Sequence, residues 1–417
     1  MPIPIVRDVC VLSPMVTSEG LVEQVAQIDD LAQDRIDGRE FFRRNHFTDG
    51  LQRLIGRGFE RLAGRSEDGA FYLTQAMGGG KTHSLIAFGL LAADPELRRE
   101  VVPRIPAGAE FGVAKVVIFN GHQNPDNLLW GFIAERLGRG EVMTPFWRSG
   151  ARTPGLDEWV AVLGEGPVLI LLDELPSYLE MAQGEPVGNS TLGDLTIGAL
   201  ERLFNALPRC PRACVVVTNL KDDVYLEGTR QLQTLIENLT KQYDRQAQPI
   251  TPVQQNSGEV YEIVRKRLFD QLPGTDKIDA VARAYVAALQ KAKRVDTIPT
   301  TPEIYIERVR ESYPFHPSIR DIVARFAENR GYQKTRALIR LLRMAVRGAL
   351  AAERDVFLVG LQHLDFNDPA TTEEIRKINP GFRMRFPAMS PIAATHLPRE
   401  LQPPTAGRRP RQSQRCC

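Results

Sequence analysis

The sequence predicts an α/β protein in which a central parallel sheet lies between two layers of helices and is followed by an all-helical domain. Three observations predict this fold. Short apolar runs alternate with helical segments, a glycine-rich turn joins the first such run to a helix, and the apolar runs disappear after about residue 255. Strands that are apolar along their whole length are typical of parallel sheets, because helices cover both faces.

Composition and charge describe an ordinary globular protein. The chain has 417 residues, of which 43% are hydrophobic and 25% charged, enough for two or three domains with buried cores. A formal net charge of +2 provides no overall attraction for nucleic acid, so DNA binding would need a local patch. The bulk charge therefore does not favour a DNA-binding function.

The sequence predicts a cytoplasmic protein that does not enter a membrane. No apolar run reaches membrane-spanning length, and the first residues, MPIPIVRDVC, lack the basic start and long apolar core of a secretion signal. Cys10, Cys210 and Cys214 are scattered and form no pair with metal-ligand spacing, which fits a reducing compartment and predicts no zinc site.

The elements of the sheet domain follow one another in a regular order. Thr48 is predicted to cap a helix whose apolar residues recur at helical spacing from Leu51 to Leu62. Strands and helices then alternate, because short β-rich apolar runs are separated by helical segments. The predicted strands are 70–74, 114–120, 167–174 and 214–219, with a short last strand at 249–253, and the predicted helices are 82–93 and 127–137.

The character of the sequence changes at about residue 255, where strand patterns give way to helical ones. Helices are predicted at 259–272, 278–293 and 337–352. From about residue 382 the chain is rich in Pro and Arg without an apolar period, which predicts a solvated tail. The predicted domains are an N-terminal helical segment at 1–66, the sheet domain at 67–255, the helical domain at 256–355 and a partly disordered tail at 356–417.

A glycine-rich turn, QAMGGGKTH at residues 75–83, joins the first predicted strand to its helix. Glycines let backbone N–H groups fold around phosphate oxygens, and the following helix directs its positive N-terminal end at the same anion. In this pattern a lysine reaches the β- and γ-phosphates of ATP, and the next hydroxyl binds Mg²⁺. The residues predicted to hold the cofactors ATP and Mg²⁺ here are Gly78, Gly79, Gly80, Lys81, Thr82 and His83.

The turn differs in one position from the usual P-loop, or Walker A, pattern. Gln75 stands where that pattern has its first glycine, and a glycine-rich turn between a strand and a helix also occurs without a ligand. The position between a buried strand and an apolar helix favours phosphate binding. His83 is interpreted as a first-turn residue packed near the nucleotide, because it has no partner at metal-ligand spacing.

Polar residues end the third and fourth predicted strands. LILLDE runs from four apolar residues into Asp173 and Glu174, as expected of a Walker B strand in which the first carboxylate holds magnesium and the second polarises water. Two carboxylates at a buried strand end are costly unless a cation neutralises them. Thr218 and Asn219 end the fourth strand, where a polar side chain could orient the water, although such a pair is also ordinary turn chemistry.

With these motifs in order, the chain resembles the AAA+ ATPases, in which a three-layer P-loop NTPase sandwich is followed by an all-helical lid domain. In that family an arginine near the end of the helix before the last strand reaches the neighbouring subunit's nucleotide. Arg245 holds that place, and Arg230 is a weaker candidate. A lid-helix arginine that contacts phosphate is implied at Arg336, with Arg340 one turn further on. Each could instead be an exposed arginine on an amphipathic helix.

More narrowly, the chain resembles a bacterial family of large ATP-binding proteins that occur with DNA methylases and helicases in anti-phage systems. The stretches that carry this resemblance include FFRRNHFTDGL, LTQAMGGGKTHSLIAFGLLA, SYPFHPSIRDI and YQKTRALIRLL, spread over residues 41–343. The resemblance implies a homo-oligomer or larger protein assembly, with DNA-modification or helicase proteins as partners. Members of that family are usually longer than this chain.

The function that these residues predict is ATP hydrolysis that drives a conformational change in a larger assembly. The alternative is a nucleotide-dependent switch or scaffold without turnover, which the departure at Gln75 favours. A DNA-translocating motor lacks support, because the sequence has no helicase motif. The predicted catalytic residues are Glu174, Lys81, Asn219, Arg245 and Arg336, and the predicted metal ligands are Thr82 and Asp173.

Overall fold

The computed structural model of the chain describes residues 3–18, 26–74, 79–102, 109–218, 237, 247–253, 258–292, 300–319, 321 and 334–378. The chain divides into two compact units. The sheet unit comprises Leu21–Lys266 and Gln333–Thr335, and the helical unit comprises Met1–Gly20, Arg267–Tyr332 and Arg336–Cys417. The first residues of the chain therefore belong to the same unit as its C-terminal third.

A five-stranded parallel sheet forms the centre of the sheet unit. Its strands are β2 (Ala70–Leu73), β3 (Lys115–Asn120), β4 (Val168–Asp173), β7 (Ala213–Thr218) and β8 (Gln248–Ile250), in the spatial order β3-β4-β7-β2-β8. All neighbouring pairs are parallel, so the carboxyl ends of the strands lie at one edge. Both β2, before the glycine-rich turn, and β4, before the acidic pair, are neighbours of β7. The three strand ends therefore lie side by side.

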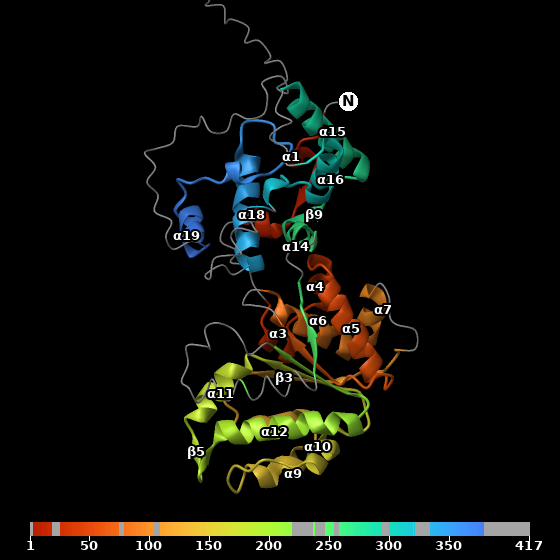
Figure 1. The fold of residues 1–417 in the computed structure, drawn as a ribbon, viewed down its shortest axis with the longest axis vertical. Coiled ribbons are helices and arrows are strands. Elements are labelled where there is room, and N and C mark those ends of the chain that lie inside the picture. Colours follow the sequence, from red (N-terminus) through yellow and green to blue (C-terminus); the bar gives the residue numbers. More distant parts are fainter. Residues whose placement is uncertain are drawn as a thin grey trace, which may run out of the picture. The chain divides into compact units, whose positions relative to one another are not determined.

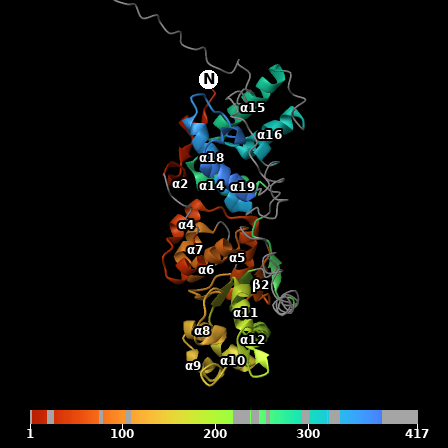
Figure 2. The same ribbon diagram turned by 90° about the vertical axis from the view of Figure 1, so that its left-hand side faces the viewer.

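A layer of helices covers each face of the sheet (Figures 1 and 2). On one face the layer consists of α3 (Ile28–Ala32), α4 (Gly38–Arg44), α5 (Asp49–Leu62), α6 (Lys81–Ala93) and α7 (Pro95–Val101). On the other it consists of α8 (Leu128–Arg136), α9 (Gly140–Met143), α10 (Leu156–Leu163), α11 (Leu175–Gln183) and α12 (Leu192–Ala206). The predicted three-layer α/β sandwich with a central parallel sheet is confirmed.

Shorter elements connect these helices. A hairpin of β5 (Pro186–Val187) and β6 (Ser190–Thr191) lies between α11 and α12. Single 3₁₀ turns occur at Thr144–Phe146 and Leu207–Arg209. Among the described residues, no helix has both the length and the apolar composition that a membrane span requires.

The two layers meet the central strands on alternating residues. In β4, Ile170 and Leu172 belong to the core under α8 to α12, whereas Leu169 and Leu171 belong to the core under α3 to α7. Successive side chains of a strand point to opposite faces, so a strand buried on both faces is apolar along its whole length. The next side chain in this alternation, Asp173, therefore falls on the face that carries α6.

The start of α5 fixes the chain where it leaves β8. Thr48 caps α5 by accepting a hydrogen bond from the N–H of Leu51 at 3.1 Å, as predicted, and its hydroxyl donates to the carbonyl of Pro252 at 2.6 Å. A Cβ at Gly50 would lie 2.0 Å from the carbonyl oxygen of Thr251, so only glycine permits this approach. The N–H of Asp49 also donates to the Glu259 carboxylate at 2.5 Å.

The helical unit is built on helices that pack with the N-terminal residues of the chain. Helices α15 and α16 lie side by side in both views (Figures 1 and 2). Strand β1 pairs antiparallel with β9, and the N–H of Val6 donates to the carbonyl of Val356 at 2.8 Å. The elements are α1 (Val6–Val9), β1 (Val11–Leu12), α2 (Pro14–Thr17), β9 (Phe269–Gln271), α15 (Thr275–Lys291), α16 (Pro302–Ser312), α18 (Lys334–Ala351), the 3₁₀ turn Leu361–His363 and α19 (Pro369–Ile378).

The helix predicted at 259–272 is shorter in the structure. Helix α14 spans Glu259–Leu268, and the following residues form β9. The strand forms because the N-terminal residues supply a partner, β1, from a distant part of the chain. Helical periodicity alone does not reveal such a partner.

Candidate nucleotide site

The N-terminus of α6 follows Gly79 and Gly80, two glycines of the predicted phosphate cradle. Gly80 is its N-cap residue and has φ +87°, a left-handed conformation that glycine adopts without strain. Gly79 is buried, and Lys81 begins the helix with only 8% of its surface exposed. The helix continues for 13 residues, so its N-terminal end carries a partial positive charge. An anion placed at this turn would meet both the helix end and the lysine.

Asp173 forms a buried polar cluster with two hydroxyl groups. The hydroxyls of Thr82, on α6, and of Thr218, at the end of β7, both hydrogen-bond the Asp173 carboxylate. The carboxylate is 2% exposed, and burial raises its pKa, with a further rise from the neighbouring charge of Glu174. The structure thus brings the end of β4 into contact with Thr82, the residue that follows Lys81.

Glu174 has an unusual backbone conformation. Its φ of +50° and ψ of +34° lie in the left-handed region, which non-glycine residues rarely adopt. Its N–H donates to Asp173 Oδ1 and to Thr218 Oγ1, each at 3.2 Å. Its carbonyl oxygen faces Gly121, where a Cβ would lie only 1.9 Å away. Backbone strain of this kind collects at functional sites, where surrounding contacts maintain it.

The chemistry of this cluster fits a magnesium ion bound together with phosphate. Mg²⁺ prefers oxygen ligands and is usually held by one or two carboxylates together with substrate phosphates and water. Thr82 and Asp173 offer such oxygens beside the cradle, and a cation would favour the ionised carboxylate that burial disfavours. Among the described residues, no group of three or more His, Cys, Asp or Glu side chains could hold a metal without such a substrate.

His83 packs against an aromatic ring of the preceding segment. Its ring stacks on Phe41 of α4, with centroids 4.6 Å apart and planes 20° apart. Phe41 is itself 7% exposed and belongs to the core under α6. The structure therefore gives His83 a packing contact beside the cradle, whereas its assignment to nucleotide binding stays a prediction.

Several predicted residues lie outside the described part of the chain. These are Gln75, Gly78, Asn219, Arg230 and Arg245. Their roles stay predictions from the sequence.

The two candidate arginines of the lid helix differ in their surroundings. Both lie on α18 of the helical unit. Arg340 forms an ion pair with Glu374 of α19 at 2.8 Å, whereas the side chain of Arg336 is exposed. No hydrogen bond or ion pair joins Arg336 to another residue in the described ranges. Arg340 therefore has a structural partner that occupies it.

Three residues near the site were not predicted. Asp29 of α3 hydrogen-bonds Asn120, the last residue of β3, and Gly121 provides the close approach to Glu174. Asn120 pairs in register with Asp173 and follows the same alternation as the other strand-end residues. A third polar residue at a strand end was a usable signal. Asp29 had none, because its partner lies 91 residues away.

The fold is that of an α/β P-loop NTPase, with a five-stranded parallel sheet and a helical C-terminal region. Two domain models of one family match the chain, the DUF499 N-terminal domain at residues 24–103 and the DUF499 second domain at residues 255–384. The first match includes α3, the glycine-rich turn and α6. The second includes α15, α16 and α18. These matches make the chain similar to the DUF499 family in both units.

Among solved structures, the chain is similar to Cdc6p from Pyrobaculum aerophilum. The identity is 15%, the TM-score is 0.33, and the alignment covers 84% of this chain and 69% of that chain. The fold of this chain follows from its own strand order and from the glycine N-cap at the start of α6. No curated protein matches the chain.

Proposed function

We propose that the chain binds ATP with Mg²⁺ and hydrolyses it. The observation that carries the proposal is the hydrogen bond between Thr82 and the buried Asp173 carboxylate, beside Lys81 at the N-terminus of α6. A carboxylate whose pKa is raised by burial is costly to keep ionised without a cation nearby. A hydroxyl and a carboxylate at a glycine-lined helix end are the ligand set of a magnesium–triphosphate site.

Each residue of the site has a distinct proposed role. Gly79 and Gly80, with Gly78, surround the phosphates, and Lys81 binds the β- and γ-phosphate oxygens. Thr82 and Asp173 hold Mg²⁺, which when bound neutralises charge on those oxygens. His83 supports the first turn of α6 through its contact with Phe41.

Glu174 is the proposed general base. Its backbone is held in the left-handed conformation by the hydrogen bonds of its N–H, which fixes where the side chain leaves the strand end. From that position the carboxylate would accept a proton from the attacking water. Asn219 would orient the same water, and Arg245 and Arg336 would stabilise charge on the departing phosphate.

The direct test is phosphate release from the full chain and from the variant Glu174→Gln. We expect the variant to lose about 100-fold or more in kcat while it keeps its affinity for ATP, because glutamine preserves the shape but cannot accept the proton. Lys81→Ala is the matched control, since it should lose ATP binding itself. Equal kcat values for the wild type and Glu174→Gln would remove Glu174 from the mechanism.

The same experiment separates hydrolysis from the rival function. A nucleotide-dependent switch or scaffold would bind ATP tightly and release no phosphate at any protein concentration. Measuring phosphate release from low to high protein concentration is therefore part of the test. A specific activity that rises with concentration would support an assembly in which Arg245 acts on a neighbouring subunit, and Arg245→Ala should abolish the rise.

We further propose that hydrolysis drives a conformational change in a larger cytoplasmic assembly, in anti-phage defence together with DNA-modification or helicase proteins. The sequence resemblance described above supports this role. Co-purification of such proteins with the full chain from its own host would test it. Loss of that association in Lys81→Ala would tie it to nucleotide binding.

A further inference from the structure

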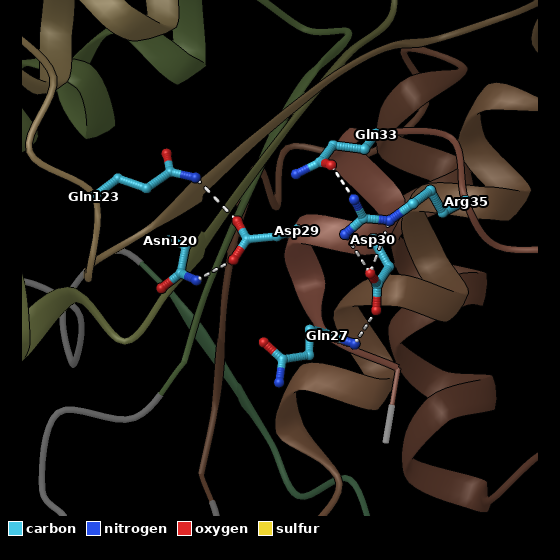
Figure 3. Close-up of polar contacts among 7 residues, drawn as sticks. All are labelled: Gln27, Asp29, Asp30, Gln33, Arg35, Asn120 and Gln123. Carbon is cyan, nitrogen blue, oxygen red and sulfur yellow. Dashed lines mark hydrogen bonds and ion pairs between the residues drawn. The ribbon is translucent and has the colours of Figure 1, made fainter. Parts of the chain in front are cut away.

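A polar contact from the N-terminal part of the sheet unit reaches the turn behind Glu174. Asp29 accepts hydrogen bonds from Asn120 Nδ2 at 2.8 Å and from Gln123 Nε2 at 2.9 Å (Figure 3). These two donors are the first and last residues of the turn that follows β3. The Asp29 carboxylate therefore hydrogen-bonds the residues at both ends of the turn.

The turn has a tight internal structure that the carboxylate completes. The N–H of Gln123 donates to the carbonyl of Asn120 at 2.9 Å, and the N–H of His122 donates to Asn120 Oδ1 at 3.2 Å. Asn120 thus uses its amide group twice, once within the turn and once toward Asp29. We name residues 120–123 together with Asp29 the β3 clasp.

The β3 clasp lies directly against the backbone of the acidic pair. The N–H of Gly121 donates to the carbonyl of Asp173 at 2.8 Å, and the carbonyl of Glu174 packs on the Cα of Gly121. The Glu174 peptide is therefore confined on one side by Gly121 and on the other by the hydrogen bond of its N–H to Thr218. If the turn moved, Gly121 would no longer confine the Glu174 peptide on that side.

Helix α3 presents Asp29 from a fixed position. Ile28 is 3% exposed in the core under α6, and Leu31 lies so close to α6 that a Cβ at Gly89 would be 2.5 Å from its Cδ2. Helix α3, which carries Asp29, therefore packs against α6, which begins with Lys81. This packing connects the β3 clasp to the cradle side of the site.

We infer that Asp29 is a positioning residue of the nucleotide site: it fastens the turn 120–123 and so holds the Glu174 peptide in its left-handed conformation. The inference rests on the proposed function where it concerns turnover. It does not rest on that function where it concerns the backbone. A charge-assisted hydrogen bond contributes more than a neutral one, so the loss of the Asp29 carboxylate should loosen both ends of the turn together.

The neighbouring residue, Asp30, offers a matched control. Asp30 points away from β3 (Figure 3). It accepts a hydrogen bond from the N–H of Gln27, which caps α3, and others from the Arg35 side chain. Asp30→Asn changes the same charge on the same helix without touching the turn. An effect specific to the β3 clasp should therefore appear in Asp29→Asn and not in Asp30→Asn.

The backbone test is amide hydrogen exchange of the nucleotide-free full chain. For Asp29→Asn we expect exchange to become about tenfold faster in peptides that contain residues 120–124 and 173–176, because a charged hydrogen-bond partner is lost. Asp30→Asn should speed exchange only within residues 27–35. Unchanged exchange in Asp29→Asn at both places, or the same change in both variants, would overturn the inference.

The kinetic test compares turnover with affinity and includes a rescue. Asp29→Asn should lower kcat about fivefold or more and leave the KM for ATP within about twofold, since the cradle is untouched. In the double variant Asp29→Asn with Asn120→Asp, the amide at position 29 donates to the carboxylate at position 120 and accepts from Gln123. This swap of the two side chains should return amide hydrogen exchange to the slow rate of the wild type and recover kcat.

The outcomes separate the inference from the proposed function. If the wild type releases no phosphate, the proposed hydrolysis fails, and the exchange measurements still decide whether the β3 clasp holds the Glu174 peptide. If the wild type hydrolyses ATP and Asp29→Asn lowers affinity instead of kcat, positioning of Glu174 by Asp29 is contradicted.

Discussion

Each unit contains a buried titratable group whose neutral form is favoured by burial, and the two pKa values shift in opposite directions. In the sheet unit, burial raises the pKa of Asp173, so the folded chain disfavours its charged form. In the helical unit, burial lowers the pKa of His316 to about 4, so the folded chain keeps that ring neutral. Asp173 is the group expected to be charged in function, whereas His316 is neutral across the physiological range.

The difference lies in what surrounds each group. His316 Nδ1 accepts from the N–H of Ser318 at 3.1 Å, so the ring proton is on Nε2, which donates to Tyr285 Oη at 2.8 Å. The neutral ring is satisfied and structural. Hydroxyl and N–H groups hydrogen-bond the Asp173 carboxylate, and these neutral partners do not neutralise its charge when it is ionised. A satisfied neutral network indicates structure, and a buried carboxylate at a helix end indicates a ligand site.

The largest expected effect separates the close approach behind Glu174 from ordinary glycines. Gly121→Ala places a methyl group against the backbone of Glu174 and Leu175, which cannot rotate away, and should lower the free energy of unfolding of the sheet unit by about 3 kcal/mol or more. Gly166→Ala is the control, because its added methyl group would have no atom within 4 Å and its effect should stay within about 0.5 kcal/mol. Equal urea denaturation midpoints for the two variants would contradict the close approach.

Acid should weaken the helical unit through His316. Because its folded pKa is depressed, the unfolded chain binds more protons between pH 6.5 and about 4, and stability is lost as the pH falls through that window. The free energy of unfolding should fall by about 3 kcal/mol in the wild type and by less in His316→Asn. Hydrogen exchange of peptides from α15 between pH 7 and pH 4.5 would measure it. A variant that loses as much stability as the wild type would assign the acid sensitivity elsewhere.

The sheet unit should respond in the opposite sense to the removal of its buried carboxylate. A raised folded pKa means that ionised Asp173 costs stability, increasingly as the pH rises above 3.8 until the folded group has lost its proton. Asp173→Asn should therefore stabilise the nucleotide-free chain at pH 7.5 by about 1 kcal/mol and lose stabilisation by Mg²⁺ and ATP. Thermal unfolding with and without both ligands measures this. A variant less stable than the nucleotide-free wild type would contradict the account.

The smallest effect concerns the two arginines of α18. Arg340→Ala removes a partner of the buried Glu374, which Lys377 also approaches at 3.7 Å, and should cost about 1 kcal/mol of stability. Arg336→Ala should leave stability unchanged and lower ATP turnover. Melting temperatures together with phosphate release distinguish the two. Loss of turnover in Arg340→Ala alone would exchange their proposed roles.

Sequence patterns predicted those features of the fold and the site that depend on residues close together in the chain. The strand ends with Asp173 and Thr218, the cap at Thr48 and the glycine turn at Gly80 each depend on neighbouring residues and on strand alternation. The contact of Asp29 with Asn120 and the pairing of β1 with β9 join segments far apart in the chain. Such contacts depend on tertiary packing, which the periodicity of apolar residues in the sequence does not reveal.

The same limit applies to the helical arginines. Arg336 and Arg340 lie one turn apart on α18, so their sequence positions did not show which of them forms an ion pair. The structure distinguishes the two arginines, because Glu374 of α19 lies beside Arg340.

The most direct measurement is the affinity of the full chain for ATP by calorimetry, with Mg²⁺ and with a chelator in its place, for the wild type, Thr82→Ala and Thr82→Ser. We expect the wild type and Thr82→Ser to bind ATP at least about tenfold more tightly with Mg²⁺, and Thr82→Ala to lose this difference. If the wild type bound ATP equally well without Mg²⁺, or Thr82→Ala kept the full difference, the pairing of Thr82 with Asp173 would not be a magnesium–nucleotide site.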